Sequence, residues 1–243
     1  MNILEISNLT KHFGGLTAVN DLDLTIKKGE ILALIGPNGA GKSTVFNCVA
    51  GVYAPSVGEI RFKGEVISGQ KPWNLSRRGL ARTFQIVKPF GPKTVLYNVM
   101  VGAFLRTNST KVAREKAEEI LTILHLEHLR DRLAGNLTIA DRKRLEIAKA
   151  MATDPELLLL DEVMAGLRPT EIDEMIGIIR GVRDRGMTVF VIEHIMRAVM
   201  ALSDRVVVIQ FGSKIAEGTP EAVTKDENVI KAYLGGEYGV SGN

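Results

Sequence analysis

The segment Gly-Pro-Asn-Gly-Ala-Gly-Lys-Ser-Thr at residues 36–44 constrains what this chain can fold into more than any other segment. It follows an apolar run at residues 30–35 that predicts a buried strand, and it precedes an apolar helix expected to begin near Lys42. The pattern G-x-x-x-x-G-K-[ST] between a strand and a helix is typical of a phosphate-binding loop. The alternative is a glycine-rich turn that only leads into a helix, but the flanking strand and helix favour the phosphate loop.

Each residue type in this segment can contribute to the binding of phosphate groups. Glycines let the backbone curl so that successive N–H groups turn toward an anion, and the following helix adds its positive N-terminal end. The Lys42 ammonium reaches the terminal phosphates, and the Ser43 hydroxyl can hold Mg²⁺. The sequence therefore predicts that a nucleoside triphosphate binds here, with contacts from Gly36, Asn38, Gly39, Gly41, Lys42, Ser43 and Thr44.

Composition allows a large core and excludes several classes of protein. The 243 residues, of which 45% are hydrophobic and 24% charged, fit one large α/β unit or one core with an inserted subdomain. The net charge of +3 comes from interspersed acids and bases, so it favours no nucleic-acid partner. No apolar run approaches the roughly 18–20 residues that span a bilayer, and Glu5 interrupts the start where a signal peptide needs apolar residues. We expect a cytosolic compartment.

The chain has a single cysteine, Cys48, just inside the helix after the phosphate loop. One cysteine can form neither a disulfide framework nor a metal cluster. Its expected role is that of a small buried hydrophobic side chain.

The pattern of apolar residues divides the chain into three regions. Residues 3–7 and 21–26 alternate as strands do, and residues 59–67 predict a hairpin, so a small antiparallel sheet is expected early. From about residue 87 to residue 153 the spacing is helical. Beyond it strands and helices alternate, which predicts a parallel sheet with helices on both faces. The predicted fold class is α/β, a nucleotide-binding core with an antiparallel β subdomain and an inserted helical subdomain.

The individual elements that these patterns predict can be given by residue range. Helices are expected at 94–105, 111–126, from about 140, at 170–185 and at 195–202, and strands at 81–84, 156–160, 188–192 and 205–209.

A second motif carries the expected hydrolytic chemistry. Four leucines at residues 157–160 end in Asp161 and Glu162, so a buried strand delivers two carboxylates at its carboxyl end, at the mouth of the nucleotide crevice. Asp161 is expected to hold Mg²⁺ opposite Ser43, and Glu162 to polarise the attacking water as general base. The alternative is a strand followed by an acidic helix cap.

Two further residues follow predicted strands. His194 comes after residues 188–193, where an imidazole could bridge the terminal phosphate and the attacking water. Gln85 follows residues 81–84, and its amide could meet Mg²⁺ or water. A histidine at a strand end is often structural and a glutamine is common on surfaces, so each depends on the other motifs for support.

The order and spacing of these motifs over essentially the whole chain resemble those of an ABC transporter ATPase subunit. The likeness is greatest to the branched-chain amino-acid importer group, and the segments that carry it are residues 11–19, 81–85, 193–194, 203–206 and 229–235. The resemblance implies a RecA-like P-loop NTPase fold with ATP and Mg²⁺ as cofactors. It implies one ABC ATPase domain over residues 1–243, with a core at 1–86 and 154–211, a helical subdomain at 87–153 and a C-terminal extension at 212–243.

The resemblance also implies partners and further contacts. Phe13 would stack on the adenine ring; the alternative is a core phenylalanine of the first hairpin. Two subunits would meet head to tail, as a homodimer or with a related partner, so that Thr138 closes the partner's ATP. Membrane permease subunits would dock on the helical region, including residues 88–97, and a substrate-binding protein would act indirectly. The chain would lie peripherally at the cytoplasmic face of the membrane.

The sequence departs from the family pattern in the segment that, by this resemblance, would contact the ATP bound to the partner subunit. Where the family reads Leu-Ser-x-Gly-Gln, residues 137–141 read Leu-Thr-Ile-Ala-Asp. Thr138 keeps a hydroxyl, but Ala140 adds a β-carbon and Asp141 adds a negative charge near a phosphate. The alternative is that this segment simply caps a helix. Other departures are Val163, Arg168 and Ile195.

Three functions remain open on the sequence. The first is an ATPase that drives an amino-acid importer. The second, motivated by residues 138–141, is a nucleotide-gated dimerising subunit with weak turnover. The third keeps the ATPase and changes the cargo, for example to lipopolysaccharide export, because these residues do not choose cargo.

Overall fold

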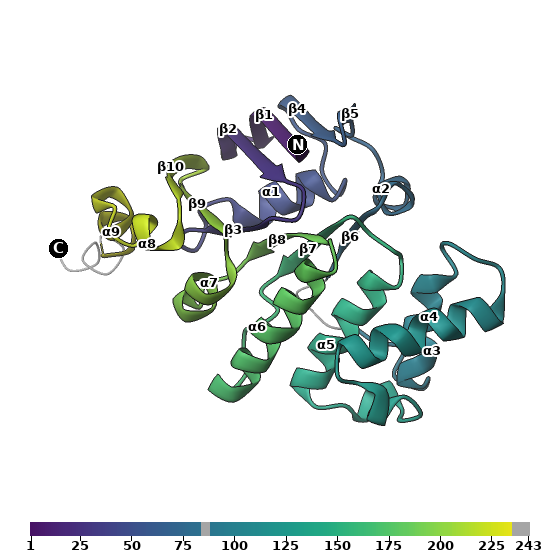
Figure 1. Cartoon of the computed structure of the whole chain (residues 1–243). Helices are drawn as coiled ribbons and strands as arrows, with labels where there is room; N and C mark the ends of the chain where they lie inside the picture. The colour runs from purple at the N-terminus through teal and green to yellow at the C-terminus, as the bar shows by residue number, and fades with distance from the viewer. Residues whose placement is uncertain (84–87, 235–243) are drawn as a thin grey trace. The chain divides into compact units, whose positions relative to one another are not determined.

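The computed structural model describes residues 1–83 and 88–234. They form two compact units, one made of Met1–Pro72 with the described residues from Phe190 onward, and one made of Trp73–Val189. Figure 1 shows the course of the chain with its elements labelled. The division predicted from the sequence has other boundaries, with a helical subdomain at residues 87–153, and it stays a prediction.

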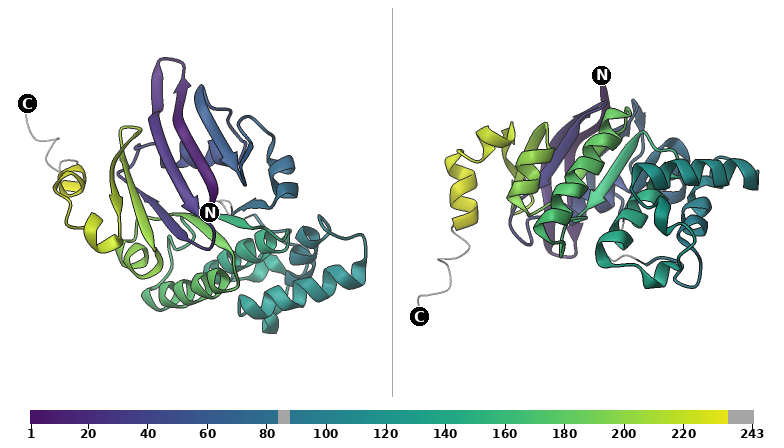
Figure 2. Two further views of the ribbon diagram at one scale, coloured as in Figure 1. Left: turned by 45° about the horizontal axis from the view of Figure 1, so that its top comes forward. Right: turned by 60° about the horizontal axis from the view of Figure 1, so that its bottom comes forward.

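The first unit contains an antiparallel sheet built from early hairpins (Figure 2). Its strands β1 (Asn2–Phe13), β2 (Leu16–Lys27), β4 (Val57–Phe62) and β5 (Glu65–Val66) lie in the order β2-β1-β4-β5. Lys63 and Gly64 join β4 to β5 with φ of 52° and 79°, the left-handed values that a two-residue hairpin turn requires. The predicted antiparallel sheet and the hairpin at residues 59–67 are confirmed.

The core of the same unit is a parallel pair of strands. β3 (Ile31–Ile35), with all its residues buried, runs parallel to β9 (Arg205–Gln210), and β10 (Ser213–Gly218) pairs antiparallel with β9. The Asp204 carboxylate accepts the Ile31 N–H at 2.7 Å, and Arg205 pairs with Glu30 at 3.2 Å, so polar contacts fix the register at the strand starts.

Helix α1 (Lys42–Val49) follows β3 and packs on this core. The Phe46 ring lies 4.6 Å from that of Phe190 in β8 (Thr188–Ile192), the strand in which the boundary between the units falls. Cys48 is buried as expected. The remaining helices of this unit are α7 (Met196–Leu202), α8 (Pro220–Val223) and α9 (Glu227–Leu234).

The second unit is largely helical around a second parallel pair, β6 (Leu80–Arg82) with β7 (Leu157–Asp161). Its α3 (Val95–Ala103) packs against α4 (Thr110–Ile123) and α5 (Ile139–Met151), and α3 lies close to α5 at Gly102, where an added Cβ would lie 2.5 Å from the Lys149 carbonyl oxygen. It also contains α2 (Pro72–Arg78) and α6 (Pro169–Asp184).

The elements predicted after residue 80 match the observed ones within a few residues at each end, whereas β1 extends to Phe13 and β2 begins at Leu16, five or six residues beyond the predicted ranges. Both parallel pairs confirm the α/β class, and the helical run predicted from about residue 87 to residue 153 contains α3, α4 and α5. The sequence did not predict α2, β10, α8 or α9. Among the residues that the structure describes, no helix is long and apolar enough to cross a bilayer.

Candidate nucleotide-binding site

The phosphate loop lies in the first unit, between β3 and α1, as predicted. Its glycines have φ values of 153° at Gly36, 79° at Gly39 and 102° at Gly41, which favour a residue without a side chain. A Cβ on Gly36 would lie 2.1 Å from the Ile209 carbonyl oxygen, and one on Gly41 would lie 2.4 Å from that of Ala18. Backbone conformation and packing therefore both require glycine at these two positions.

Lys42 lies at the centre of the loop. Its ammonium donates to the carbonyl oxygens of Gly36 at 2.7 Å and Pro37 at 2.9 Å, and the residue is only 8% exposed. Helix α1 begins at this lysine, and its N-cap Gly41 supplies no side-chain cap to the first N–H groups. Asn38, Gly39 and Ser43 are exposed on the loop, whereas Thr44 is half-buried. A curved backbone with a central ammonium and uncapped helix amides is suited to bind a polyphosphate.

The C-terminal helix α9 also reaches this loop. Burial raises the pKa of the Tyr233 hydroxyl, and a hydrogen bond with the backbone of Gly36 acts in the opposite direction. Tyr233 thus connects the last described helix with the first glycine of the loop.

Phe13 ends β1 and is 40% exposed. It meets Tyr53 edge-on, with ring centroids 5.1 Å apart, and the Lys11 ammonium lies 5.1 Å from its ring. The alternative of a core phenylalanine is therefore wrong. An exposed aromatic ring is available for stacking, although its role toward adenine stays a prediction.

His194 is exposed and comes two residues after β8, immediately before Ile195, which is the N-cap of α7. It belongs to the same unit as the phosphate loop.

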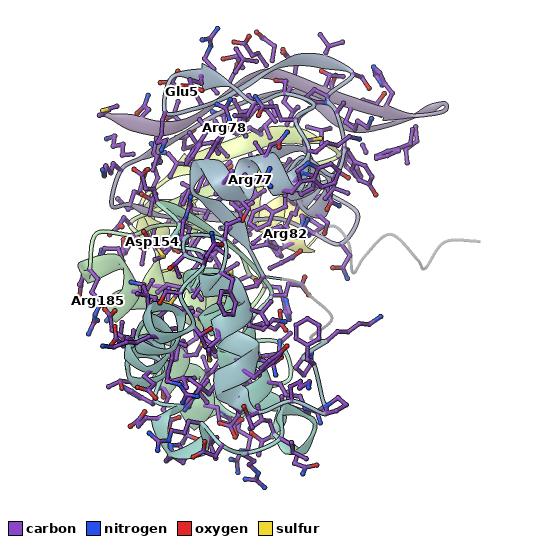
Figure 3. The ribbon with its side chains drawn as sticks, turned by 90° about the vertical axis from the view of Figure 1, so that its right-hand side faces the viewer. Glu5, Arg77, Arg78, Arg82, Asp154 and Arg185 are labelled. Atoms are coloured by element: carbon purple, nitrogen blue, oxygen red, sulfur yellow. The ribbon has the colours of Figure 1, made fainter. Side chains whose placement is uncertain are left out.

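Asp161 lies in the second unit, at the carboxyl end of β7, with 4% exposure. Arg82, labelled in Figure 3 together with Arg77 and Arg78 of α2, donates to its Oδ2 at 2.8 Å. The Asp161 N–H donates to the Thr83 hydroxyl at 3.2 Å. This carboxylate is thus fixed in place by its neighbours, and the guanidinium offsets the cost of burying its charge.

Glu162 follows directly, with a left-handed φ of 48° and a half-buried side chain. Its carbonyl oxygen accepts the Ala165 N–H at 3.3 Å and the Lys143 ammonium at 2.9 Å. The next helix, α6, begins only at Pro169 and has Arg168 as its N-cap. The alternative interpretation of Asp161 and Glu162 as an acidic helix cap is therefore wrong.

Thr138 is the N-cap of α5. Its hydroxyl accepts the Asp141 N–H at 3.1 Å and donates to the Asp141 Oδ2 at 2.7 Å. Arg142 donates to the Gly135 carbonyl at 2.6 Å, while Ala140 is buried. Thr138 thus caps α5, and the Asp141 carboxylate is already bound to the hydroxyl expected to meet the partner's phosphate; the contact with that phosphate stays a prediction.

The predicted residues fall into two groups, one in each unit. The first unit carries the phosphate loop and His194, and the second carries Asp161, Glu162 and Thr138. Gln85 lies outside the described residues. The sequence did not predict the contacts of Arg82 with Asp161, of Lys143 with Glu162 or of Tyr233 with Gly36. An arginine inside a short apolar strand indicates a carboxylate partner, but the contacts of Lys143 and Tyr233 leave no local pattern.

A phosphate loop between a parallel strand and a helix, in a chain where two carboxylates end another parallel strand, defines a P-loop nucleoside triphosphatase. Residues 19–165 match the family model described as ABC transporter, and residues 213–239 match that of the branched-chain amino acid ATP-binding cassette transporter. The chain belongs to the ABC transporter family, as an ATP-binding and ATP-hydrolysing subunit.

Individual relatives extend this assignment over the full length. The high-affinity branched-chain amino acid transport ATP-binding protein BraF of Pseudomonas aeruginosa is 43% identical, over 96% of this chain and 98% of that protein. The lipopolysaccharide export system ATP-binding protein LptB of Haemophilus influenzae is 37% identical over 98% and 99%. The ADP conformation of MJ1267, an ATP-binding cassette of an ABC transporter, is 32% identical with a TM-score of 0.89, over 97% and 99%.

Proposed function

We propose that this chain powers an importer for branched-chain or related amino acids, bound peripherally at the cytoplasmic face of the membrane. The observation that carries the proposal is the full-length likeness to BraF, supported by the match of the C-terminal segment at residues 213–239 to the branched-chain family model. The likeness to LptB is lower, so lipopolysaccharide export is the weaker cargo assignment.

The proposed roles in the first unit follow from the loop geometry. The loop backbone and Lys42 bind the phosphates of ATP, because the loop is curved around an ammonium that is already in place. Asn38, Gly39 and Thr44 contribute to the same cradle. Phe13 stacks on the adenine ring with its exposed face. His194 contacts the terminal phosphate and the attacking water.

The donor atoms of this chain fit Mg²⁺. The Ser43 hydroxyl, the Asp161 carboxylate and the Gln85 amide are hard oxygen donors of the kind this cation takes. When bound, Mg²⁺ would neutralise negative charge on the phosphate oxygens. Glu162 accepts a proton from the attacking water as general base.

A second candidate function rests on one contact. The Thr138 hydroxyl is hydrogen-bonded to Asp141, which supports a subunit that dimerises on ATP and turns over slowly. We propose that two ATPase subunits, identical or related, meet so that Thr138 of each faces the partner's ATP. Steady-state ATPase with Glu162→Gln as the control separates the two functions; turnover unaffected by that change would remove Glu162 from the mechanism.

A docking surface for the permease is proposed on α3. Tyr97, Val101 and Phe104 recur at helical spacing and are 46%, 40% and 42% exposed, with the half-exposed Phe90 before the helix. Such an apolar stripe indicates a partner surface. The substrate-binding protein would act through the permease.

Reconstitution tests the cargo. The chain is purified with the permease subunits that accompany it, and the complex is placed in vesicles with its substrate-binding protein. We expect ATP-dependent uptake of leucine, isoleucine or valine, and none with Lys42→Ala. ATP turnover stimulated by lipopolysaccharide and indifferent to these amino acids would contradict the importer.

A further inference from the structure

The backbone at Glu162 adopts a conformation that L-residues rarely hold without support. Its φ of 48° lies in the left-handed region, where the β-carbon crowds the following carbonyl oxygen. Such residues persist where the surrounding structure over-determines them, and they cluster at functional sites. The orientation of the Glu162 side chain therefore depends on what holds its peptide group.

Two donors hold that peptide group through the Glu162 carbonyl oxygen. The Ala165 N–H lies at 3.3 Å within the same turn, and the Lys143 ammonium lies at 2.9 Å in a partly buried position. The lysine contact is shorter and charge-assisted, so it is the stronger of the two. Val163 and Met164, which follow in the turn, are buried and restrict the backbone further.

We infer that Lys143 is a positioning residue for Glu162, an inference that rests on the proposed role of Glu162 as general base. Rotation about the Glu162 ψ angle moves the carbonyl and the Cα–Cβ bond relative to one another. A carbonyl held by Lys143 therefore restrains the direction of the Cα–Cβ bond from which the carboxylate extends. The lysine itself contacts neither ATP nor water in this role.

The position of Lys143 in the chain gives this contact a second consequence. Lys143 lies in α5, five residues after the N-cap Thr138, whose hydroxyl is the group proposed to face the partner's ATP. One side chain thus connects the first turns of α5 to the turn that carries the general base. A shift of the α5 start changes the support of Glu162 in the same subunit.

Kinetics of variants in the purified full chain, or in its dimer, test the inference. Lys143→Met removes the ammonium and keeps a chain of similar length. We expect kcat to fall on the order of 10- to 100-fold with KM for ATP unchanged, because misplacement of a catalytic group affects the chemical step rather than binding. Lys143→Arg keeps a charged donor and is expected to recover a large part of kcat.

The matched control is Lys149→Met in the same helix. Lys149 is also partly buried and donates to one carboxylate oxygen, that of Glu146 at 2.7 Å. Its loss is expected to lower the midpoint of thermal unfolding and to leave kcat of the folded protein unchanged. A decrease in kcat equal to that of Lys143→Met would show a general effect of weakening α5 and would overturn the inference.

A double-variant cycle supplies the decisive readout. A residue that acts through Glu162 has no further effect once Glu162 is Gln, so Lys143→Met is expected to leave the residual single-turnover rate of Glu162→Gln unchanged. An equal fold-loss in both backgrounds would contradict the inference. Normal turnover in Lys143→Met beside a slow Glu162→Gln would refute the inference alone, whereas normal turnover in Glu162→Gln would refute the general base and the inference together.

Discussion

At the scale of single residues, lysine side chains stabilise irregular backbone at both places where chemistry is proposed. Lys42 donates to two carbonyls of the phosphate loop, and Lys143 donates to that of Glu162. The Glu162 carbonyl also accepts the Ala165 N–H, and the Pro37 carbonyl accepts the Ala40 N–H, so the ammonium adds a charge-assisted donor to an acceptor that the backbone already satisfies. Loss of either lysine therefore removes structural support as well as charge.

The close packing at Gly41 leads to a prediction on stability. Gly41→Ala places a Cβ 2.4 Å from the Ala18 carbonyl oxygen at a φ of 102°, so we expect the free energy of unfolding to fall by about 2–4 kcal/mol, from steric overlap and backbone strain together. Denaturant unfolding measures the change.

Gly14→Ala separates the two causes of this loss. Gly14 has a φ of 56°, but nothing lies within 4 Å of its added Cβ. The expected loss is about 1 kcal/mol, from the backbone conformation alone. Equal losses at Gly14 and Gly41 would mean that the contact with Ala18 yields at little cost.

Cys48 allows a prediction on reactivity. Burial raises the pKa of its thiol to about 11, so at pH 8 almost all of it is protonated and few thiolates are available to react. We expect alkylation by iodoacetamide at pH 8 to be slow in the folded chain and fast in denaturant, measured by mass spectrometry. Rapid labelling of the folded chain would contradict the buried position.

At the scale of elements, the start of α5 combines a helix cap with a proposed contact to another subunit. The Thr138 hydroxyl already binds both the N–H and the carboxylate of Asp141. A phosphate that recruits this hydroxyl must replace the contact with the carboxylate and accept a nearby negative charge. The segment is therefore stable as a helix start and poorly adapted to an anion.

Changing residues 140 and 141 to the family pattern should improve this contact. Ala140→Gly with Asp141→Gln removes a β-carbon and a negative charge, so we expect faster ATP turnover by the dimer, by a factor of about 3–10 if one unit charge at a screened distance is removed. The helix should lose roughly 1 kcal/mol because glycine replaces alanine.

Asp141→Asn alone is the control for charge. It keeps an oxygen that can accept a hydrogen bond and leaves Ala140 in place. Steady-state ATPase measures each variant, and unchanged turnover in all of them would mean that residues 138–141 do not limit hydrolysis.

Elements with strong local patterns were predictable, and those held by tertiary contacts were not. Residues 188–192 form a strand with the predicted bounds because Thr188 is followed by four apolar β-branched or aromatic residues, a short run that favours a buried strand. Helix α2 has a single buried residue, Leu75, which leaves no periodicity to detect. The C-terminal β10, α8 and α9 are short, and β10 is largely half-exposed.

The same distinction applies to the candidate site. The phosphate loop, Asp161 and Glu162 were predictable because their chemistry depends on adjacent residues in fixed order. The contacts of Arg82 with Asp161 and of Lys143 with Glu162 join residues 79 and 19 positions apart. Their geometry depends on the packing of β6 and α5, which no local pattern encodes.

At the scale of the whole molecule, the departure at residues 137–141 concerns the segment proposed to face a partner, whereas the phosphate loop agrees with the family pattern. A dimer of identical chains would contain two equally weakened sites. A related partner with a Ser-x-Gly-Gln segment would instead complete the phosphate loop of this chain, which would make its site the faster of the two.

Site-specific inactivation measures this asymmetry. With such a partner, Lys42→Ala in this chain is expected to abolish most of the ATPase activity of the complex, and the equivalent change in the partner to abolish less. Equal losses would indicate two equivalent sites or a homodimer. The complex must be assembled before the assay so that both variants are compared at the same subunit ratio.

The contacts of Lys42 also bear on how fast a nucleotide is captured. A loop that must order around its ligand delays association, because only the ordered fraction can bind. Here the Lys42 ammonium holds the phosphate loop in its curved conformation. The loop therefore loses its conformational entropy when the chain folds, and not each time a nucleotide binds. Differences in affinity between nucleotides are then expected in their dissociation rates rather than in their association rates.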